Sequence, residues 1–327
     1  MRLQAIPTIR IIGQVYTHKG LLLAMKNVLV TGASGFLGKR LIERQLSLKS
    51  QYSLFYPSIE ELDLTDLYSV DTYFKENTFD IVIHLAAMHG GVGNADKKAL
   101  EYLEDNLLIN YNTVHNSIKH NVKYFIMIGS SSCYNNQAPI PTTEDSLWHG
   151  RPESSYGVCK LVMLEHLLAQ NIMDWVCLIP PNYYGPGCDV DGESAHLIPA
   201  TIKKFENAKV HGIPFIDVWG DGSQIRDFLY IDDMVSILCN VLERNKYSKQ
   251  ILNVSTNTGT SIKEAVTAIR SLLELNNIEI RWDTSKPTGT HKKILSNERL
   301  MQIDNSIRIT PFQDGIKKTI DWYKERK

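Results

Sequence analysis

Three features are missing from this 327-residue sequence, and each absence excludes a class of protein. No apolar run approaches the roughly 18 residues that a membrane-spanning helix needs. The five cysteines include no Cys-x-x-Cys pair, so we expect neither a disulfide framework nor a metal site, and a reducing, cytoplasmic setting. The formal net charge is −1, and no long run of residues carries charge of one sign, so the sequence does not indicate a nucleic-acid-binding surface.

The first 24 residues carry no recognisable targeting signal. The apolar stretch Leu21–Ala24 is too short for the core of a signal peptide, and the basic residues around it are scattered. We interpret residues 1–24 as a poorly ordered extension, or as the product of an upstream start with Met25 as the functional one. The remaining chain is long enough for one large domain or two closely associated ones.

A strand, a tight glycine turn and the start of a helix follow one another over residues 26–40. Val28–Val30 predict a short buried strand, glycines then recur at three-residue spacing, and an apolar helical pattern begins at Phe36. Such a turn lets the backbone approach a pyrophosphate, and free N–H groups at the helix start meet its charge. We expect a dinucleotide here, lined by Gly32, Ser34, Gly35, Phe36, Leu37 and Gly38.

Strands and helices alternate after this turn, which predicts an α/β fold with a doubly wound parallel sheet of the Rossmann type. The patterns predict strands at 52–56, 79–87, 122–128 and 175–180, and helices at 100–120 and 232–242. The C-terminal third mixes helices with a strand at 279–282. We expect a nucleotide-binding domain of 25–180 plus about 215–250, and a smaller, discontinuous α/β substrate domain of about 181–214 plus 251–327.

The end of the second strand bears on the choice between NAD and NADP. No acidic residue directly follows strand 52–56, and Ser58 is placed to bond a 2′-phosphate. Lys39 and Arg40 add positive charge nearby. These features favour NADPH over NAD. Asp63 is expected either to bond the adenine amino group or to act as a simple turn residue.

Hydroxyl side chains follow the strand that ends at Ile128. Twenty-six residues after Ser130, Tyr156 and Lys160 stand four apart and so share one helix face. An ammonium beside a phenol is expected to lower the pKa of the phenol toward neutral, and a serine hydroxyl can hold a substrate oxygen between them. The pattern predicts a proton-transfer centre.

The glycine turn, Leu85-Ala-Ala, the serine strand and Tyr156-x-x-x-Lys160 together resemble the extended short-chain dehydrogenase/reductase family. The resemblance implies that Ser130, Tyr156 and Lys160 are the catalytic set, and that Lys160 also holds the nicotinamide ribose. It implies a homodimer formed through the helices that start near Leu100 and Tyr156. The further cofactor contacts expected are Asp63, Leu64, Leu85, Ala86, Ala87, Pro180 and Asn182.

The second half of the chain narrows the resemblance to the GDP-L-fucose synthase branch of that family. The matching segments are His89-Gly-Gly-Val, Asn182-Tyr-Tyr-Gly-Pro, Ala195-His-Leu-Ile-Pro, Val218–Phe228 and Lys286-Pro-Thr-Gly. Arg226 suits a planar clamp on a phosphate, and Trp219 either stacks on a base or fills the core. The resemblance implies a GDP-linked sugar contacted by His89, Asn182, His196, Lys204, Trp219, Arg226 and Lys286.

One catalytic position departs from that branch, whose members use a cysteine and a histidine to invert C-3 and C-5 of a 4-keto-6-deoxy sugar before reducing C-4. The histidine matches His196, but the cysteine position is Ser132, and Cys133 comes one residue later. Neighbours on a strand face opposite sides, so we expect Cys133 to point away. Serine is too weak an acid or base to replace a thiol near neutral pH. The sequence thus predicts NADPH-dependent reduction at C-4, with epimerisation lost or altered.

Other activities use the same framework. A nucleotide-sugar 4-epimerase keeps NAD bound and returns the hydride, and the turn Gly32-Ala-Ser-Gly35 is closer to those enzymes. A 4,6-dehydratase is disfavoured because Ser131 and Ser132 stand where that group has an acidic pair. A non-catalytic dinucleotide sensor is disfavoured because Tyr156 and Lys160 are both present.

Overall fold

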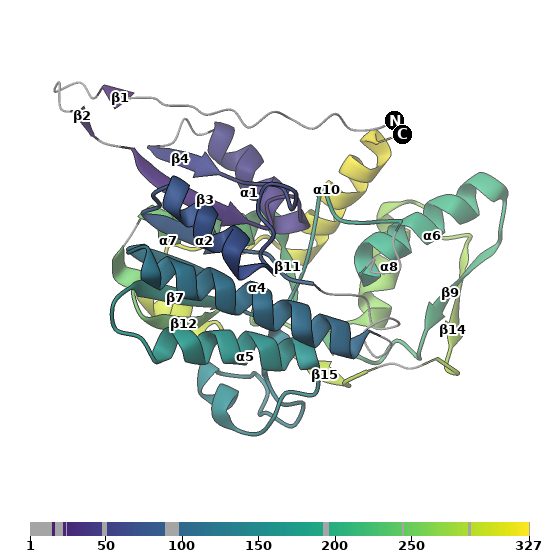
Figure 1. Cartoon of the computed structure of the whole chain (residues 1–327). Coiled ribbons are helices and arrows are strands. Elements are labelled where there is room, and N and C mark those ends of the chain that lie inside the picture. Colours follow the sequence, from purple (N-terminus) through teal and green to yellow (C-terminus); the bar gives the residue numbers. More distant parts are fainter. Residues whose placement is uncertain are drawn as a thin grey trace.

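The computed structural model describes residues 15–16, 22–23, 25–47, 51–88, 98–191, 196–243, 245–286 and 289–326. Its centre is a six-stranded parallel sheet in the order β12-β7-β6-β5-β3-β4 (Figure 1). This confirms the expected α/β fold with a Rossmann-type sheet. The strands are β3 (Lys26–Thr31), β4 (Tyr52–Phe55), β5 (Ile81–His84), β6 (Tyr124–Ile128), β7 (Asp174–Ile179) and β12 (Gln250–Asn253).

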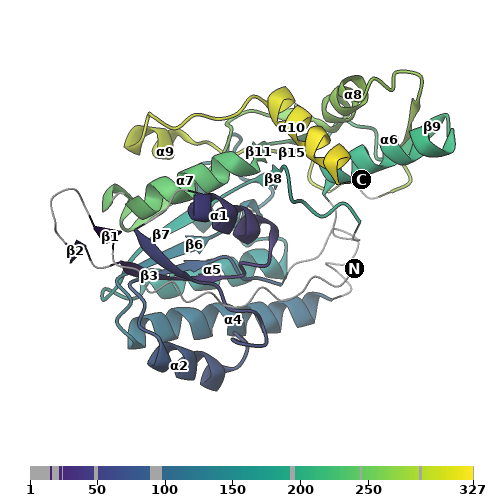
Figure 2. The ribbon, with the colours of Figure 1, turned by 90° about the horizontal axis from the view of Figure 1, so that it is seen from above.

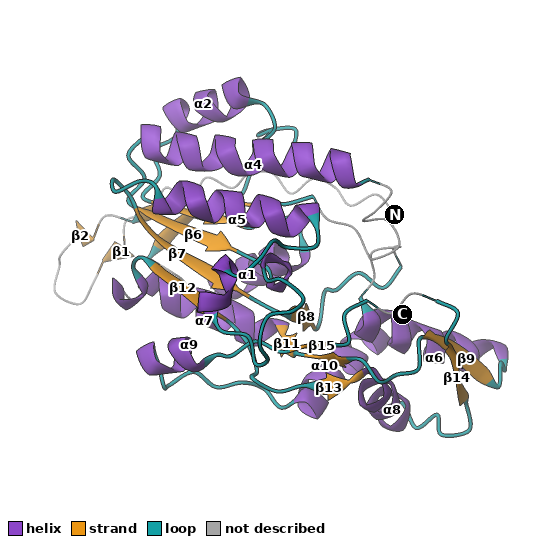
Figure 3. Cartoon of the chain, turned by 90° about the horizontal axis from the view of Figure 1, so that it is seen from below, coloured by secondary structure: helices purple, strands orange, loops and turns teal. Residues whose placement is uncertain are grey.

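Helices cover both faces of this sheet, because each parallel connection must cross over from one strand end to the next start. One face carries α1 (Phe36–Ser47) and α7 (Ile231–Glu243), as Figure 2 shows. The other face carries α2 (Leu67–Glu76), α4 (Ala99–Lys119) and α5 (Ser155–Leu168), which lie together in Figure 3. Burial from both sides explains why the central strands read as continuous apolar runs.

A second group of elements lies beyond the carboxyl ends of the strands (Figure 1). Its helices are α6 (Leu197–His211), α8 (Ile262–Leu272) and α10 (Phe312–Glu325). Helix α9 (Glu298–Ile303) instead packs against β12 of the large sheet and lies beside α7 in Figure 2. Its paired strands are β8 (Asn182–Tyr184) with β11 (Phe228–Tyr230), β9 (Phe215–Trp219) with β14 (Glu279–Asp283), and β10 (Ile225–Arg226) between β13 (Thr260–Ser261) and β15 (Lys292–Lys293). The short elements are β1 (Val15–Tyr16), β2 (Leu22–Leu23), η1 (Ser131–Cys133), η2 (Glu144–Trp148) and η3 (Asn245–Tyr247).

Two strands pair outside the domain in which the sequence analysis placed them. β9 pairs with β14 and not with the six-stranded sheet, although residues 215–250 were expected in the nucleotide-binding domain. β12 pairs with β7 and so belongs to the large sheet, although it begins the second part of the expected substrate domain. Both strands are short, and their partners lie far away in the sequence. The domain division itself stays a prediction.

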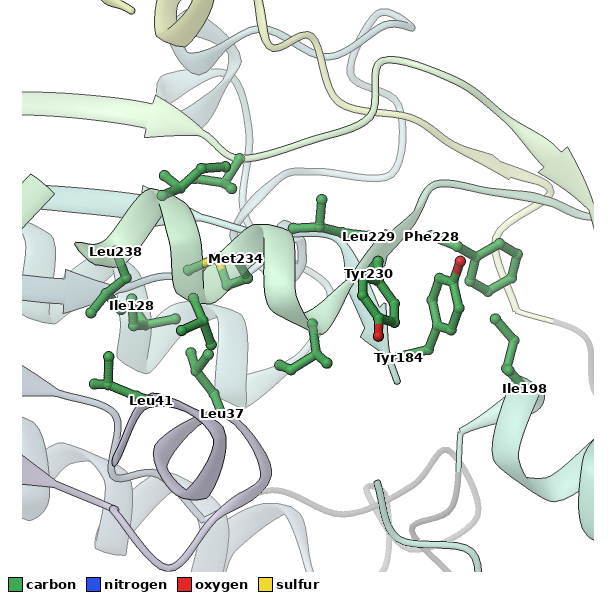
Figure 4. Close-up of a cluster of buried hydrophobic side chains, with 14 of the residues drawn as sticks. Leu37, Leu41, Ile128, Tyr184, Ile198, Phe228, Leu229, Tyr230, Met234 and Leu238 are labelled. Atoms are coloured by element: carbon green, nitrogen blue, oxygen red, sulfur yellow. The ribbon is translucent and has the colours of Figure 1, made fainter. Parts of the chain in front are cut away.

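One buried apolar cluster joins the sheet to the second group of elements. Figure 4 shows Leu37 and Leu41 of α1 facing Met234 and Leu238 of α7. The same cluster continues through Tyr184 and Phe228, whose ring centroids are 6.4 Å apart, to Ile198 at the start of α6. Because the packing is continuous, this second group of elements and the sheet share one core.

Two absences hold for the described part of the chain. No helix there is long and apolar enough to cross a membrane, and no group of metal-ligating side chains is found. The five cysteines are all free and buried. The reducing setting expected from the cysteine pattern stays a prediction.

Candidate active site

The glycine turn between β3 and α1 is a close-packed cradle. Gly32 has a φ of +68°, and a Cβ there would lie 2.5 Å from the backbone nitrogen of Ala86 at the end of β5. A Cβ on Gly38 would lie 2.5 Å from the Cα of Ala33, so α1 begins directly against the turn. Ser34 and Gly35 are exposed. A backbone cradle open to one side at a helix N-terminus fits the pyrophosphate of a dinucleotide.

A buried hydrogen-bond relay connects this cradle to the helix of the catalytic pair. The hydroxyl of Thr31 lies 2.9 Å from Nδ1 of His84, and Nε2 of His84 lies 3.2 Å from the side-chain oxygen of Asn110. The amide nitrogen of Asn110 donates to the backbone oxygen of Cys159 at 3.3 Å. Burial, together with the charge of Lys160, lowers the pKa of His84 to about 3, so the ring is a neutral structural link.

Ser130 lies at the entrance of the one-turn helix η1, which follows β6. Its hydroxyl oxygen accepts a hydrogen bond from the backbone N–H of Ser132 at 3.1 Å. Because η1 is a 3₁₀ turn, the strand alternation that we expected here is wrong. Cys133 nevertheless packs into the core at 2% exposure, where burial raises the pKa of its thiol to about 11. Ser132 is half-buried.

Helix α5 lies directly on η1. Ser154 caps the helix by accepting from the backbone N–H of Gly157 at 3.1 Å. A Cβ on Gly157 would collide with the backbone oxygen of Ser132. The glycine between Tyr156 and Lys160 therefore brings the pair against the turn that carries Ser130.

Burial shifts the pKa of both members of the Tyr156–Lys160 pair. The Nζ of Lys160 lies 5.7 Å from the ring centroid of Tyr156, and Lys160 is 2% exposed. Burial lowers the pKa of Lys160 to about 8. Burial, followed by the neighbouring Tyr183, raises the pKa of Tyr156, so the expected lowering is wrong in this structure. A phenol that keeps its proton at neutral pH is suited to donate it.

Two cationic side chains lie next to each other on neighbouring strands. Arg226 of β10 is the registered partner of Lys293 on β15. The Nη1 of Arg226 donates to the backbone oxygens of Ile225 at 2.9 Å and His291 at 3.4 Å. Neither cation forms an ion pair with a carboxylate among the described residues, and burial lowers the pKa of each. Two half-buried cations without an acidic partner favour an anionic ligand.

Asp227 holds the two strands of this cation pair together. Its carboxylate is 2% exposed and accepts from the hydroxyls of Ser255 and Thr256 at 2.7 Å each. Its backbone N–H donates to the backbone oxygen of Lys293 at 3.2 Å. The sequence analysis missed Asp227 and Lys293, although the cationic run Lys292-Lys293 after a Pro/Gly turn was a signal.

Four further residues predicted to contact the substrate lie in the described part of the chain. Trp219 is 51% exposed at the end of β9, which excludes the core-filling alternative. Lys204 is exposed and donates to the backbone oxygen of Asp217 at 2.7 Å. His196 is exposed just before α6, and Lys286 is exposed just after β14. His89 lies outside the described residues.

Three residues that were expected at or near the cofactor have partners within the protein. Arg40 donates to both carboxylate oxygens of Asp232, at 2.6 and 3.0 Å, and to Glu43 at 3.0 Å, so the positive charge that it was expected to add is paired with acids. The backbone N–H of Ser58 donates to Glu61 at 2.8 Å. Asp63 accepts from the backbone and hydroxyl of Thr65 and so forms the turn.

The remaining predicted cofactor residues lie along the carboxyl ends of the strands. Leu64 precedes α2, Leu85, Ala86 and Ala87 follow β5, and Pro180 and Asn182 follow β7. Since ligands of such sheets bind beyond these strand ends, the predicted positions are compatible with one dinucleotide.

Comparisons with known proteins agree with this geometry. Residues 28–255 match the NAD dependent epimerase/dehydratase family. The chain is 28% identical over 302 residues to GDP-L-fucose synthase 1 of Arabidopsis thaliana, covering 90% of this chain and 92% of the relative. It is 28% identical over 317 residues to GDP-L-fucose synthase of Escherichia coli K12, covering 93% and 98%.

Solved structures show the same fold. A GDP-L-fucose synthetase from Naegleria fowleri bound to NADP superposes with a TM-score of 0.82 at 24% identity, covering 93% of this chain and 94% of that one. A GDP-mannoheptose C4 reductase from Campylobacter jejuni with NADP bound gives 0.81 at 23% identity, covering 93% and 99%. With the glycine cradle, the Tyr156–Lys160 pair and a family match over most of its length, this chain belongs to the NAD-dependent epimerase/dehydratase family of extended short-chain dehydrogenases/reductases.

Proposed function

We propose that this protein reduces C-4 of a 4-keto-6-deoxy sugar linked to GDP, using NAD(P)H. The observation that carries the proposal is the pair of half-buried Tyr156 and buried Lys160, packed against the turn of Ser130. The chain also presents the Arg226–Lys293 cation pair. The names of the curated relatives and of the C4 reductase support a GDP-sugar substrate. NADP in two solved structures supports NADPH as reductant, whereas the contacts of Ser58 and Arg40 do not.

The side chains account for the proton and charge changes of the reaction. Ser130 donates a hydrogen bond to the ketone oxygen, and Tyr156 transfers its phenolic proton to that oxygen as the alcohol forms. The ammonium of Lys160 stabilises the resulting phenolate. The nicotinamide supplies the hydride when it is bound. Arg226 and Lys293 hold the diphosphate of the nucleotide.

Epimerisation at C-3 and C-5 needs a group that exchanges protons with carbon near neutral pH. Ser132 has only a hydroxyl, and the Cys133 thiol is buried with its pKa raised to about 11. We therefore expect turnover of GDP-4-keto-6-deoxymannose in deuterated water to oxidise NAD(P)H without placing deuterium at C-3 or C-5, as read by NMR. Ser132→Cys is expected to introduce exchange at these carbons, whereas Cys133→Ser is expected to leave it absent.

The outcomes of this experiment separate the candidate activities. Deuterium at C-3 and C-5 with the natural sequence would contradict the argument from Ser132. Oxidation of NAD(P)H would by itself support the reductase. No oxidation, together with NAD that copurifies with the protein, would favour the 4-epimerase alternative.

We propose that two copies associate through α4 and α5, which leave large apolar side chains exposed next to each other. Leu108 and Tyr111 of α4 are 46% and 50% exposed, and Val162 and Leu168 of α5 are 48% and 43% exposed. An apolar surface on two adjacent helices is typical of an interface. Light scattering is expected to give the mass of a dimer, and Leu108→Glu that of a monomer. Val210→Glu, an exposed apolar site on α6, is the control and should leave the dimer intact.

A further inference from the structure

The carboxylate of Asp227 connects the cation pair to the edge of the large sheet. The backbone N–H of Asp227 donates to Lys293 and extends the pairing of β10 with β15, which does not depend on the side chain. One carboxylate oxygen accepts from the hydroxyl and the backbone N–H of Thr256, at 2.7 and 3.3 Å. The other accepts from the Ser255 hydroxyl at 2.7 Å, and both partners directly follow β12 and Val254. The longest contact, 3.5 Å to the backbone nitrogen of Leu295, returns to the segment after β15.

Backbone hydrogen bonds continue this connection to η1, the turn that follows β6. The N–H of Val254 donates to the backbone oxygen of Ile179 in β7 at 2.9 Å, so the segment after β12 prolongs the large sheet. The N–H of Ser131 in η1 donates to the backbone oxygen of Pro180, directly after β7, at 3.1 Å. A chain of short contacts thus runs from the catalytic turn across two strand ends to the carboxylate, and from there to the cation pair.

Burial fixes the arrangement of this carboxylate and its donors. Asp227 is among the buried charged residues and forms no ion pair with any described residue. Burial raises the pKa of Asp227, and the hydrogen bonds from Thr256 and Ser255 oppose that shift. A buried charge without a counter-charge costs free energy unless donors surround it. The carboxylate and its donors therefore hold each other in one geometry.

A second connection limits what the carboxylate alone controls. The backbone N–H of Thr142 donates to the backbone oxygen of Ile294, and the N–H of Ser296 donates to that of Thr142, both at 2.8 Å. These bonds tie the segment after β15 to the chain that follows η1. Loss of the Asp227 carboxylate is therefore expected to shift the cation pair and not to release it.

We propose that Asp227 is a positioning residue, which sets the place of the Arg226–Lys293 pair relative to Tyr156 and so aligns the sugar for reduction. The inference rests on the proposed function, in which the cation pair holds the diphosphate and the phenol meets the ketone oxygen at C-4. Because the diphosphate and the sugar are joined covalently, a displaced diphosphate carries C-4 with it. A misplacement of about 1 Å at a reacting atom can slow the chemical step by about a hundredfold.

The test separates alignment from affinity in Asp227→Ala. With saturating NAD(P)H, kcat for the GDP-linked 4-keto sugar is expected to fall by about tenfold or more, since the second connection keeps part of the alignment. The dissociation constant of free GDP, measured by calorimetry, should change little, because the paired strands still present both cations. The dissociation constant of the dinucleotide should also change little. Removal of a cation of the pair is expected to give the reverse pattern, with affinity lost and kcat kept.

A pair of variants at the partner of the carboxylate gives an independent comparison. Thr256→Val removes a hydroxyl that donates to Asp227 at 2.7 Å and keeps the shape of the side chain. Its kcat is expected to fall in the same direction as that of Asp227→Ala, by a smaller factor, because one hydrogen bond of several is lost. Thr256→Ser keeps the hydroxyl and should keep the natural kcat.

Asp304→Ala is the matched control for the loss of a buried carboxylate. Asp304 follows α9, is 4% exposed, and accepts from the hydroxyl of Tyr247 in η3 at 2.8 Å. Its removal should lower the temperature of thermal unfolding, as the removal of Asp227 does, without lowering kcat or the affinity for GDP.

Each contrary result has its own meaning. A loss of GDP affinity in Asp227→Ala, with or without a loss of kcat, would show that the carboxylate shapes the cation pair itself and would overturn the positioning role. Unchanged kcat, or an equal loss of kcat in Asp304→Ala, would overturn it as well. If Asp227→Ala does not fold, equal kcat values for Thr256→Val and Thr256→Ser would overturn it. Absence of reduction by the natural sequence would overturn the proposed function and this inference together.

Discussion

Replacing Tyr156 with phenylalanine is expected to lower kcat for ketone reduction by about a thousandfold, because general acid catalysis by a positioned side chain contributes factors of this size. The phenol is half-buried and its pKa is raised, and in the proposed reaction it donates the proton. The substitution removes one oxygen from a packed site and leaves the helix contacts of α5 unchanged. Single-turnover oxidation of NAD(P)H with the 4-keto sugar measures the loss.

The pH profile gives the same experiment a second readout. Lys160, with a pKa of about 8, is protonated below that value and neutral above it. Reduction is therefore expected to slow as the pH rises through about 8, since the phenolate then forms without a cation beside it. Binding of dinucleotide to Tyr156→Phe serves as the control and should stay within a few fold. A variant that keeps most of its rate would show that another group supplies the proton.

Replacing Arg226 with methionine is expected to raise KM for the GDP-sugar by about a hundredfold and to change kcat little, because a half-buried charged hydrogen-bond partner of a phosphate is removed. Methionine retains the length and apolar stem of the side chain. The affinity for free GDP, measured by calorimetry, should fall by a similar factor, since the diphosphate is present in both ligands. Arg226→Lys is expected to recover part of the loss, because it keeps the charge without the planar fork.

Lys292 is the matched control for this cation pair. It precedes Lys293 on β15, is exposed, and faces the other side of the strand. Lys293→Met is expected to behave like Arg226→Met, whereas Lys292→Met should leave KM unchanged. A fall in kcat at constant KM in Arg226→Met would contradict the assignment of a diphosphate site and would place Arg226 nearer to the reacting carbon.

Local pattern was enough to predict most of the fold. The strand at 52–56 is found as β4, and the helix at 100–120 is found as α4, each within one residue at either end. These elements have apolar periods that no distant contact overrides. The pairing of β9 with β14 was not predictable, because the partners lie some sixty residues apart and the alternation of β14 indicates a strand without indicating its partner.

The residues of the candidate site could be predicted from the sequence, but their pKa values and their ion-pair partners could not. Tyr156 and Lys160 were placed together by helical spacing, yet the sequence does not reveal the burial that raises one pKa and lowers the other. Arg40 was expected to add positive charge near the cofactor. In the structure it donates to Asp232, which lies 192 residues later in the chain and so could not be foreseen as its partner. Lys293 was missed because its relation to Arg226 exists only through strand pairing.

The contact between Gly157 and the backbone of Ser132 has a consequence for the loop between them. The spacing of hydroxyl and phenol is fixed where helix and turn touch, and not by the chain that joins them. Within the connection, η2 is tied to β12 because Glu144 accepts a hydrogen bond from the backbone N–H of Asn253. We therefore expect only its exposed residues, such as 148–151, to change in sequence without moving Ser130 and Tyr156.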